Sequence, residues 1–192
     1  MFSVSPRHLT RDELEAGLDD IRRAPKDRGE LKLIVRRPDI GVREILDEGE
    51  LDTSVGLKGD TWPIRGSSRT DDGQSHPDMQ LNIMSARAAA LVAQDESRWP
   101  LAGDQLFIDI DLSDANLPPG TRLALGSAVI EITAQPHNGC AKFVERFGRD
   151  AMEFVNSPVG KELHLRGVNA KVVRAGVIRV GDAATKITGG RK

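Results

Sequence analysis

After Trp99-Pro100 the chain is built mainly of short segments of strand-like composition, separated by glycine and proline. These segments are 105–110, 122–125, 128–133, 163–166, 170–174 and 177–180. Short strands with turn residues at regular intervals are typical of a closed barrel or a sandwich, which leaves few strand edges exposed. The sequence therefore predicts a mainly β architecture of the α+β class, with helices around it.

The rest of the chain supplies the predicted helices. Thr10 and Glu13 form a capping box at the start of the first one. Further predicted helices are 41–51, 85–94 and 139–156, and further predicted strands are 30–37 and 79–84. Residues 52–77 are rich in Gly, Ser, Asp and Pro without apolar periodicity, and stretches of this kind are usually functional or mobile.

The length of 192 residues suits a single domain with a small addition. We expect a helical N-terminal extension over 1–28, a barrel domain over 29–185 and a tail over 186–192. No stretch approaches the uncharged apolar length of a transmembrane helix, and the first residues lack the apolar run of a signal peptide. These features predict a cytoplasmic protein with no membrane partner.

Charge and aromatic content exclude several classes of partner. The chain has 27 Lys and Arg against 29 Asp and Glu, which argues against a nucleic-acid polymer as the main partner. Aromatic residues are 4% of the chain, too few for a base-stacking platform. With one cysteine, scattered histidines and no flavin motif, we expect no disulfide, no flavin, and no zinc or iron–sulfur site built by the protein.

The single cysteine, Cys140, lies where a predicted turn meets a predicted helix. A thiol at a helix start beside Lys142 is favoured as the nucleophilic, metal-ligating thiolate. Alternatively, Cys140 is a small buried hydrophobe packed against Phe143 and Phe147. His137, three residues earlier, is either a partner for the thiol or a polar turn residue.

Two Gly-Asp turns and one arginine complete the candidates. Backbone amides in turns such as Gly59-Asp60 and Gly103-Asp104 can hold anions, although both are also ordinary turn chemistry. Arg166 ends a predicted strand, and a guanidinium at a strand end suits an anionic oxygen. The alternative is a surface arginine with a packed stem.

Six segments, in order along the chain, resemble the MOSC family, named for the C-terminal domain of molybdenum cofactor sulfurase. They are Gly56–Trp62, Ala102–Leu106, Gly126–Ile132, Cys140–Phe143, Gly167–Val173 and Gly176–Asp182. Two places depart from the family pattern. The family often has Arg-x-Pro-Cys where this chain has His137-Asn138-Gly139-Cys140, and Gly-Glu-Asn where it has Gly103-Asp104-Gln105.

The resemblance implies a closed β-barrel of the pyruvate-kinase-barrel type, molybdenum cofactor, and Cys140 as the catalytic residue that ligates molybdenum. The residues it suggests for holding the cofactor are Asp60, Asp104, Asn138, Lys142 and Arg166, with Arg65 a weaker candidate. His137 and Asn138 would line the approach to the metal.

The activity that the resemblance implies is reduction of N-hydroxylated small molecules, such as hydroxylaminopurines, with electrons from separate redox proteins. Two alternatives stay open. In one, Cys140 carries sulfur as a persulfide for cofactor or metal–sulfur cluster assembly. In the other, the chain is a non-catalytic binding barrel with Cys140 in its core.

Overall fold

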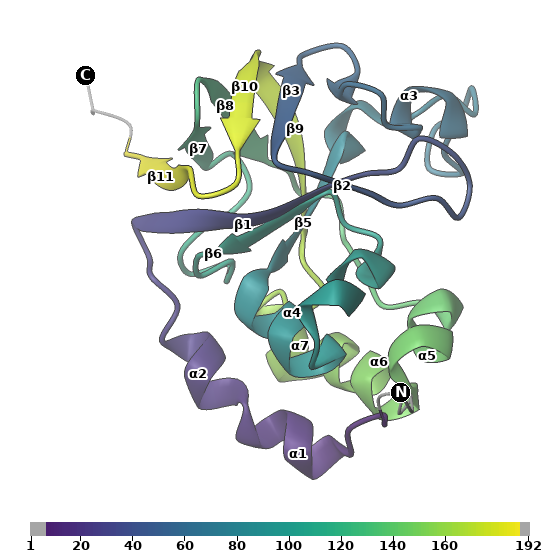
Figure 1. Cartoon of the computed structure of the whole chain (residues 1–192), viewed down its shortest axis with the longest axis vertical. Helices are drawn as coiled ribbons and strands as arrows, with labels where there is room; N and C mark the ends of the chain where they lie inside the picture. The colour runs from purple at the N-terminus through teal and green to yellow at the C-terminus, as the bar shows by residue number, and fades with distance from the viewer. Residues whose placement is uncertain (1–6, 189–192) are drawn as a thin grey trace.

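Seven strands close into a β-barrel in the computed structural model, which describes residues 7–188 (Figure 1). Their order around the barrel is β11-β7-β8-β9-β5-β6-β1, and pairing of β1 with β11 closes it. Only the β5–β6 pair is parallel among these described strands. The barrel strands are β1 (Arg28–Arg36), β5 (Leu81–Ser85), β6 (Leu106–Asp109), β7 (Arg122–Leu125), β8 (Ala128–Ile132), β9 (Val168–Arg174) and β11 (Ala183–Ile187). The predicted closed barrel is confirmed.

Four further strands extend this frame. Strand β2 (Glu44–Leu46) pairs with β1. The second sheet has the order β10-β3-β4. Its strands are β3 (Glu48–Asp52), β4 (Gly56–Leu57) and β10 (Gly176–Arg179).

Most helices gather at one end of the barrel, whereas α3 lies beside β3 (Figure 1). The α-helices are α1 (Arg11–Ala16), α2 (Leu18–Arg22), α3 (Trp62–Arg65), α4 (Ala86–Ala93), α5 (Ala141–Phe147), α6 (Arg149–Asn156) and α7 (Pro158–Glu162), and the 3₁₀ helices are η1 (Pro77–Met79) and η2 (Glu96–Ala102). The capping box of Thr10 and Glu13 is present. No helix in residues 7–188 is long and apolar enough to cross a membrane.

Two apolar clusters hold the layers together. One fills the barrel with side chains such as Leu31, Ile83 and Ile130. The other lies between the barrel and the helices. Leu14 and Ile21 of the N-terminal helices belong to this second cluster, so the described part of the predicted 1–28 extension packs on the domain.

The predicted helix over 41–51 is wrong, because β2 and β3 occupy this stretch. Gly49 and Leu51 are buried while the residues between and before them are exposed, which is the two-residue period of a strand. A Cβ on Gly49 would lie 2.9 Å from Cδ1 of Leu57, so this strand also needs the glycine for close packing. The apolar residues before Gly49 have helical spacing but do not form a buried helix face, since Ile45 is 57% exposed.

Three other boundaries also differ. The predicted strand over 163–166 is a turn after α7, in which the amide of Leu165 donates to the carbonyl of Gly160. Gly148, with φ of 94°, divides the helix predicted over 139–156 into α5 and α6. Strand β11 continues two residues past the predicted end of the barrel at 185.

The turn between β7 and β8 offers a test of the barrel geometry. Gly126 has φ of 56°, and a Cβ there would lie 2.3 Å from the carbonyl oxygen of Val177. We predict that Gly126→Ala lowers the free energy of unfolding by about 3 kcal/mol or more, through strain and clash together. Gly120→Ala is the matched control, because its φ is 89° but its Cβ would meet nothing within 4 Å. If urea denaturation shows the same loss of unfolding free energy in Gly126→Ala and Gly120→Ala, the close packing at Gly126 is contradicted.

Candidate functional site

Four consecutive carbonyl oxygens at the end of η2 each accept a hydrogen bond from a different arginine. Arg43 donates to the carbonyl of Pro100 at 3.3 Å and Arg146 to that of Leu101 at 2.6 Å. Arg166 donates to the carbonyl of Ala102 at 2.8 Å and Arg37 to that of Gly103 at 3.0 Å. Carbonyls at a helix C-terminus lack partners within the helix and carry partial negative charge. They therefore gather four guanidinium groups from distant parts of the chain at one place.

A buried carboxylate, Asp60, fixes the first of these arginines. Its Oδ2 accepts from the backbone amide and Nε of Arg37 at 3.0 and 2.9 Å, and its Oδ1 accepts from Nη2 at 2.8 Å. The amide of Trp62 also donates to Oδ1. The Asp60 side chain is fully enclosed, and its two oxygens hold Arg37 and the start of α3.

A second buried carboxylate, Asp104, holds Arg166 and His137. Its Oδ2 accepts from Nη1 of Arg166 at 2.7 Å, and its Oδ1 lies 3.0 Å from Nε2 of His137. Burial raises the pKa of Asp104, but the charge of Arg166 and the hydrogen bonds from both partners outweigh burial and hold the pKa at about 2. Burial, together with the charge of Arg166, lowers the pKa of His137. A neutral His137 therefore donates its Nε2–H to an ionised Asp104.

A basic cavity of about 440 Å³ opens beside these pairs. Its charged lining consists of the cations Arg37, Arg43, Arg65 and Lys142 and of one acid, Asp39. Burial and the charges of Arg146, Arg37 and Arg65 lower the pKa of Arg43, and burial and the charge of Arg37 lower that of Arg65. Neither Arg43 nor Arg65 has an ion pair among the described residues. The cavity thus concentrates positive charge that an anionic ligand would relieve.

Cys140 follows a segment that two polar side chains, the buried Asn169 and the half-buried Asn156, hold in place. Nδ2 of Asn169 donates to the carbonyls of Gln135 and Pro136 at 3.0 and 3.3 Å. Asn156 accepts from the amide of Gly139 at 2.9 Å and donates to its carbonyl at 3.1 Å. Cys140 is exposed and caps α5, so a fixed backbone presents the thiol to solvent.

The same network links this segment to the buried pairs. Nη1 of Arg37 donates to Oδ1 of Asn82 at 3.3 Å, and Nδ2 of Asn82 donates to Oδ1 of Asn169 at 2.6 Å. His137, within the segment, is bonded to Asp104. The backbone before the thiol is therefore tied to both buried carboxylates.

Comparison with known proteins identifies the family. A family model described as "MOSC domain" matches residues 72–185, which is more than half of the chain. The chain belongs to the MOSC family. A search of the curated proteins finds no match.

Solved structures share this MOSC fold. The YuaD protein from Bacillus subtilis is 17% identical, with a TM-score of 0.58 over 82% of this chain and 94% of YuaD. YiiM from Escherichia coli is 19% identical, with a TM-score of 0.54 over 85% of this chain and 72% of YiiM. YiiM from Geobacillus stearothermophilus is 12% identical, with a TM-score of 0.52 over 86% and 75%. At these identities the likeness concerns the fold.

The predicted site residues of this MOSC chain differ in whether they line a cavity or are enclosed. Lys142 and Arg65 line the basic cavity together. Asp60 and Asp104 are enclosed, so they reach a bound group only through the arginines they hold. The buried alternative for Cys140 is wrong, because its side chain is exposed.

Other predicted residues line a different cavity. Asn138, His137 and Arg166 line a separate cavity that shares no lining residue with the basic one. Arg166 is buried against Phe143, with its guanidinium carbon 5.2 Å from the ring centroid. The prediction that these three residues face the cofactor stays a prediction.

Sequence reasoning missed Arg37, Arg43 and Asn156. Arg37 ends the alternating strand before Pro38, and such a position gives a weak signal for a functional arginine. Arg43 and Asn156 carry no local signal, because their roles depend on carbonyl 100 and Gly139, which are remote in sequence.

The lowered pKa of His137 gives a pH prediction. Below about 6.5 the unfolded chain binds a proton at this histidine that the folded chain does not bind until its lower pKa is reached. The free energy of unfolding therefore decreases as the pH is lowered through that window. We predict that His137→Gln makes the free energy of unfolding less sensitive to acidification from about pH 7 to about pH 5. His8→Gln, at an exposed histidine, should retain the wild-type slope, and an unchanged slope in His137→Gln would contradict the burial argument.

Proposed function

We propose that this MOSC protein binds molybdenum cofactor, with Cys140 as the protein ligand of the metal, and reduces N-hydroxylated small molecules. One observation carries the proposal: a cavity lined by Arg43 and Arg65, neither of which has an ion pair among the described residues, adjoins the helix that begins at the exposed Cys140. Lys142 lines that cavity two residues after Cys140, so the two features adjoin along the chain.

The residues present fit such a cofactor. A thiolate is a soft ligand that suits molybdenum, and the Cys140 thiol is exposed. The described residues contain no cluster of three or more His, Cys, Asp or Glu side chains able to hold a metal ion. A metal brought by its own organic ligand needs only one protein donor. The phosphate of such a ligand needs several cations, which Arg43, Arg65 and Lys142 supply.

The chain's own contribution would be binding and orientation. Arg43, Arg65 and Lys142 would hold the anionic end, and Arg37, fixed by Asp60, would form the floor of the cavity. When bound, the cofactor would supply two-electron removal of an oxygen atom from the substrate. Electrons would come from separate redox proteins, and we place the reaction in the cytoplasm.

A sulfur-carrier role is the second candidate, and the exposure of Cys140 favours it equally. A persulfide on Cys140 requires an accessible thiol and no metal. The unpaired arginines distinguish the two roles, because a persulfide alone does not need a basic cavity of this size. The same cavity argues against a purely structural barrel.

Metal analysis tests the cofactor proposal. We predict about one molybdenum per chain in protein purified from cells that make the cofactor, and loss of that metal in Cys140→Ala. Arg43→Gln with Arg65→Gln should lower cofactor retention about tenfold or more, because two charge-assisted contacts are lost. Arg22→Gln with Arg23→Gln, at two exposed arginines at the end of α2, removes the same charge and should retain the metal.

Other outcomes separate the alternatives. Metal-free protein whose Cys140 carries sulfur released by cyanide would support the carrier role. Protein with neither metal nor bound sulfur would contradict both. Loaded protein that fails to reduce 6-hydroxylaminopurine with a chemical reductant would contradict the reductase activity while leaving cofactor binding intact.

A further inference from the structure

A second site lies beside the segment that precedes Cys140. It consists of two cavities of about 200 and 340 Å³, both lined by Asp114, Pro136, His137 and His164. They lie between that segment, the loop before β7 and the turn after α7. The proposed cofactor site does not account for this space, because the two cavities share no lining residue with the basic cavity.

The polar half of this second site contains a donor that lacks a partner. Arg166 lines the larger cavity with 9% of its side chain exposed. Nη1 and Nη2 are bonded to Asp104 and the carbonyl of Ala102, but Nε has no hydrogen-bond partner. It is the only such buried side-chain nitrogen or oxygen in residues 7–188. A buried N–H without an acceptor is costly, so an acceptor supplied from the cavity would stabilise the site.

A second cation lines the same cavity. Lys161, on α7, has no ion pair with any of the described residues. An ammonium and a buried guanidinium N–H beside one cavity suit an oxygen anion.

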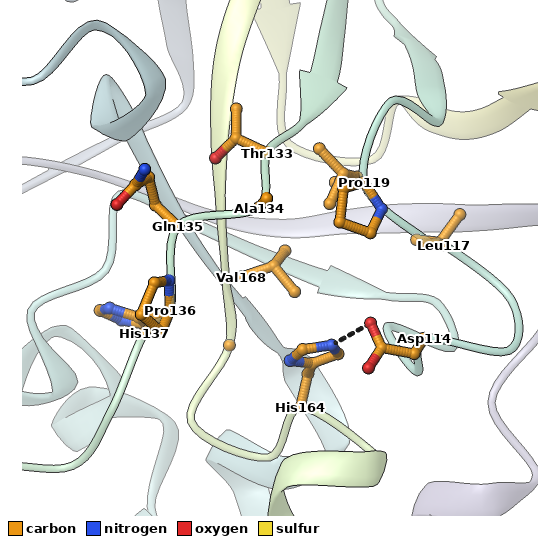
Figure 2. A pocket seen from close by; sticks show the side chains of 12 residues that line it. Asp114, Leu117, Pro119, Thr133, Ala134, Gln135, Pro136, His137, His164 and Val168 are labelled. Atoms are coloured by element: carbon orange, nitrogen blue, oxygen red, sulfur yellow. Dashed lines mark hydrogen bonds and ion pairs between the residues drawn. The ribbon is translucent and has the colours of Figure 1, made fainter.

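Among the described residues, one acidic side chain lines this site, Asp114, and it already contacts a histidine. Oδ1 of Asp114 lies 2.9 Å from Nε2 of His164, and the dashed line in Figure 2 marks this contact. The Asp114 side chain is 64% exposed, so water screens its charge. His137 also faces the site, but its lowered pKa keeps it neutral.

The smaller cavity provides an apolar half. Leu117, Pro119 and Val168 surround it, with Ala134 on the neighbouring wall (Figure 2). Inorganic anions gain nothing from such a surface, whereas a short hydrocarbon body is stabilised by leaving water. The two halves together therefore match an anion with an apolar body.

We propose that this second site binds a small monocarboxylate with a short apolar body. The carboxylate accepts from Nε of Arg166 and from the ammonium of Lys161. The hydrocarbon body lies against Leu117 and Val168. The proposal does not depend on molybdenum binding at Cys140, because it uses none of the residues that line the basic cavity.

Titration of the full chain with isobutyrate, acetate and inorganic phosphate tests the proposal, followed by NMR or calorimetry. We expect isobutyrate to bind about fivefold or more tightly than either acetate or phosphate. Lys161→Gln should weaken isobutyrate binding about fivefold or more, and Ala134→Leu should weaken it by narrowing the apolar half. Both positions line the site without belonging to either core cluster, so both variants should fold.

Lys142→Gln is the matched control, because it removes a cation from the basic cavity instead. Isobutyrate binding that survives Lys142→Gln and weakens in Lys161→Gln supports the proposal. The reverse pattern would place the carboxylate in the basic cavity and overturn it. Phosphate binding as tight as isobutyrate binding, or no saturable binding of isobutyrate, would overturn it as well.

Discussion

The site depends on two buried carboxylates, each of which holds an arginine. Both carboxylates are fully enclosed. Asp60 is paired at hydrogen-bond distance with Arg37, and Asp104 with Arg166. Removing one partner of such a pair leaves an uncompensated buried charge, which costs about 3–5 kcal/mol. Geometry rather than net stability is what these pairs contribute, because a buried ion pair is often no more stable than apolar packing. They fix guanidinium groups at one end of the barrel.

These pairs also account for the charge of the basic cavity. Two buried acids neutralise two arginines, while Arg43 and Arg65 beside them have no acidic partner among the described residues. Burial, and then the charge of neighbouring arginines such as Arg37, lowers the pKa of both Arg43 and Arg65. A net charge near zero for the whole chain thus coexists with a strongly positive cavity. The thiol of Cys140, two residues before the Lys142 that lines this cavity, follows a backbone segment that Asn156 and Asn169 fix.

Local signals in the sequence predicted the local structure. The capping box of Thr10 and Glu13 needs only residues three positions apart, and it is present. The barrel strands after residue 100 were mostly recognisable from their turns. The helix expected over 41–51 failed because pairing with β1 and with the second sheet outweighs local apolar spacing. The strand expected over 163–166 failed because α7 ends there in a turn.

The candidate site was predictable only where a family segment marked it. Cys140 and Lys142 lie in such a segment, and the structure leaves the thiol exposed and puts Lys142 on the basic cavity. Asp60 was identified as a family turn residue, but its enclosure by Arg37 is a tertiary feature. Arg43 could not be found from sequence, since its partner is a backbone carbonyl that any residue would offer.

The central claim is that Cys140 binds molybdenum directly, and X-ray absorption at the molybdenum edge tests it most directly. The account predicts one sulfur ligand fewer around molybdenum in Cys140→Ser than in the wild-type protein, under conditions in which both retain the cofactor. Identical sulfur coordination in the two proteins would contradict it.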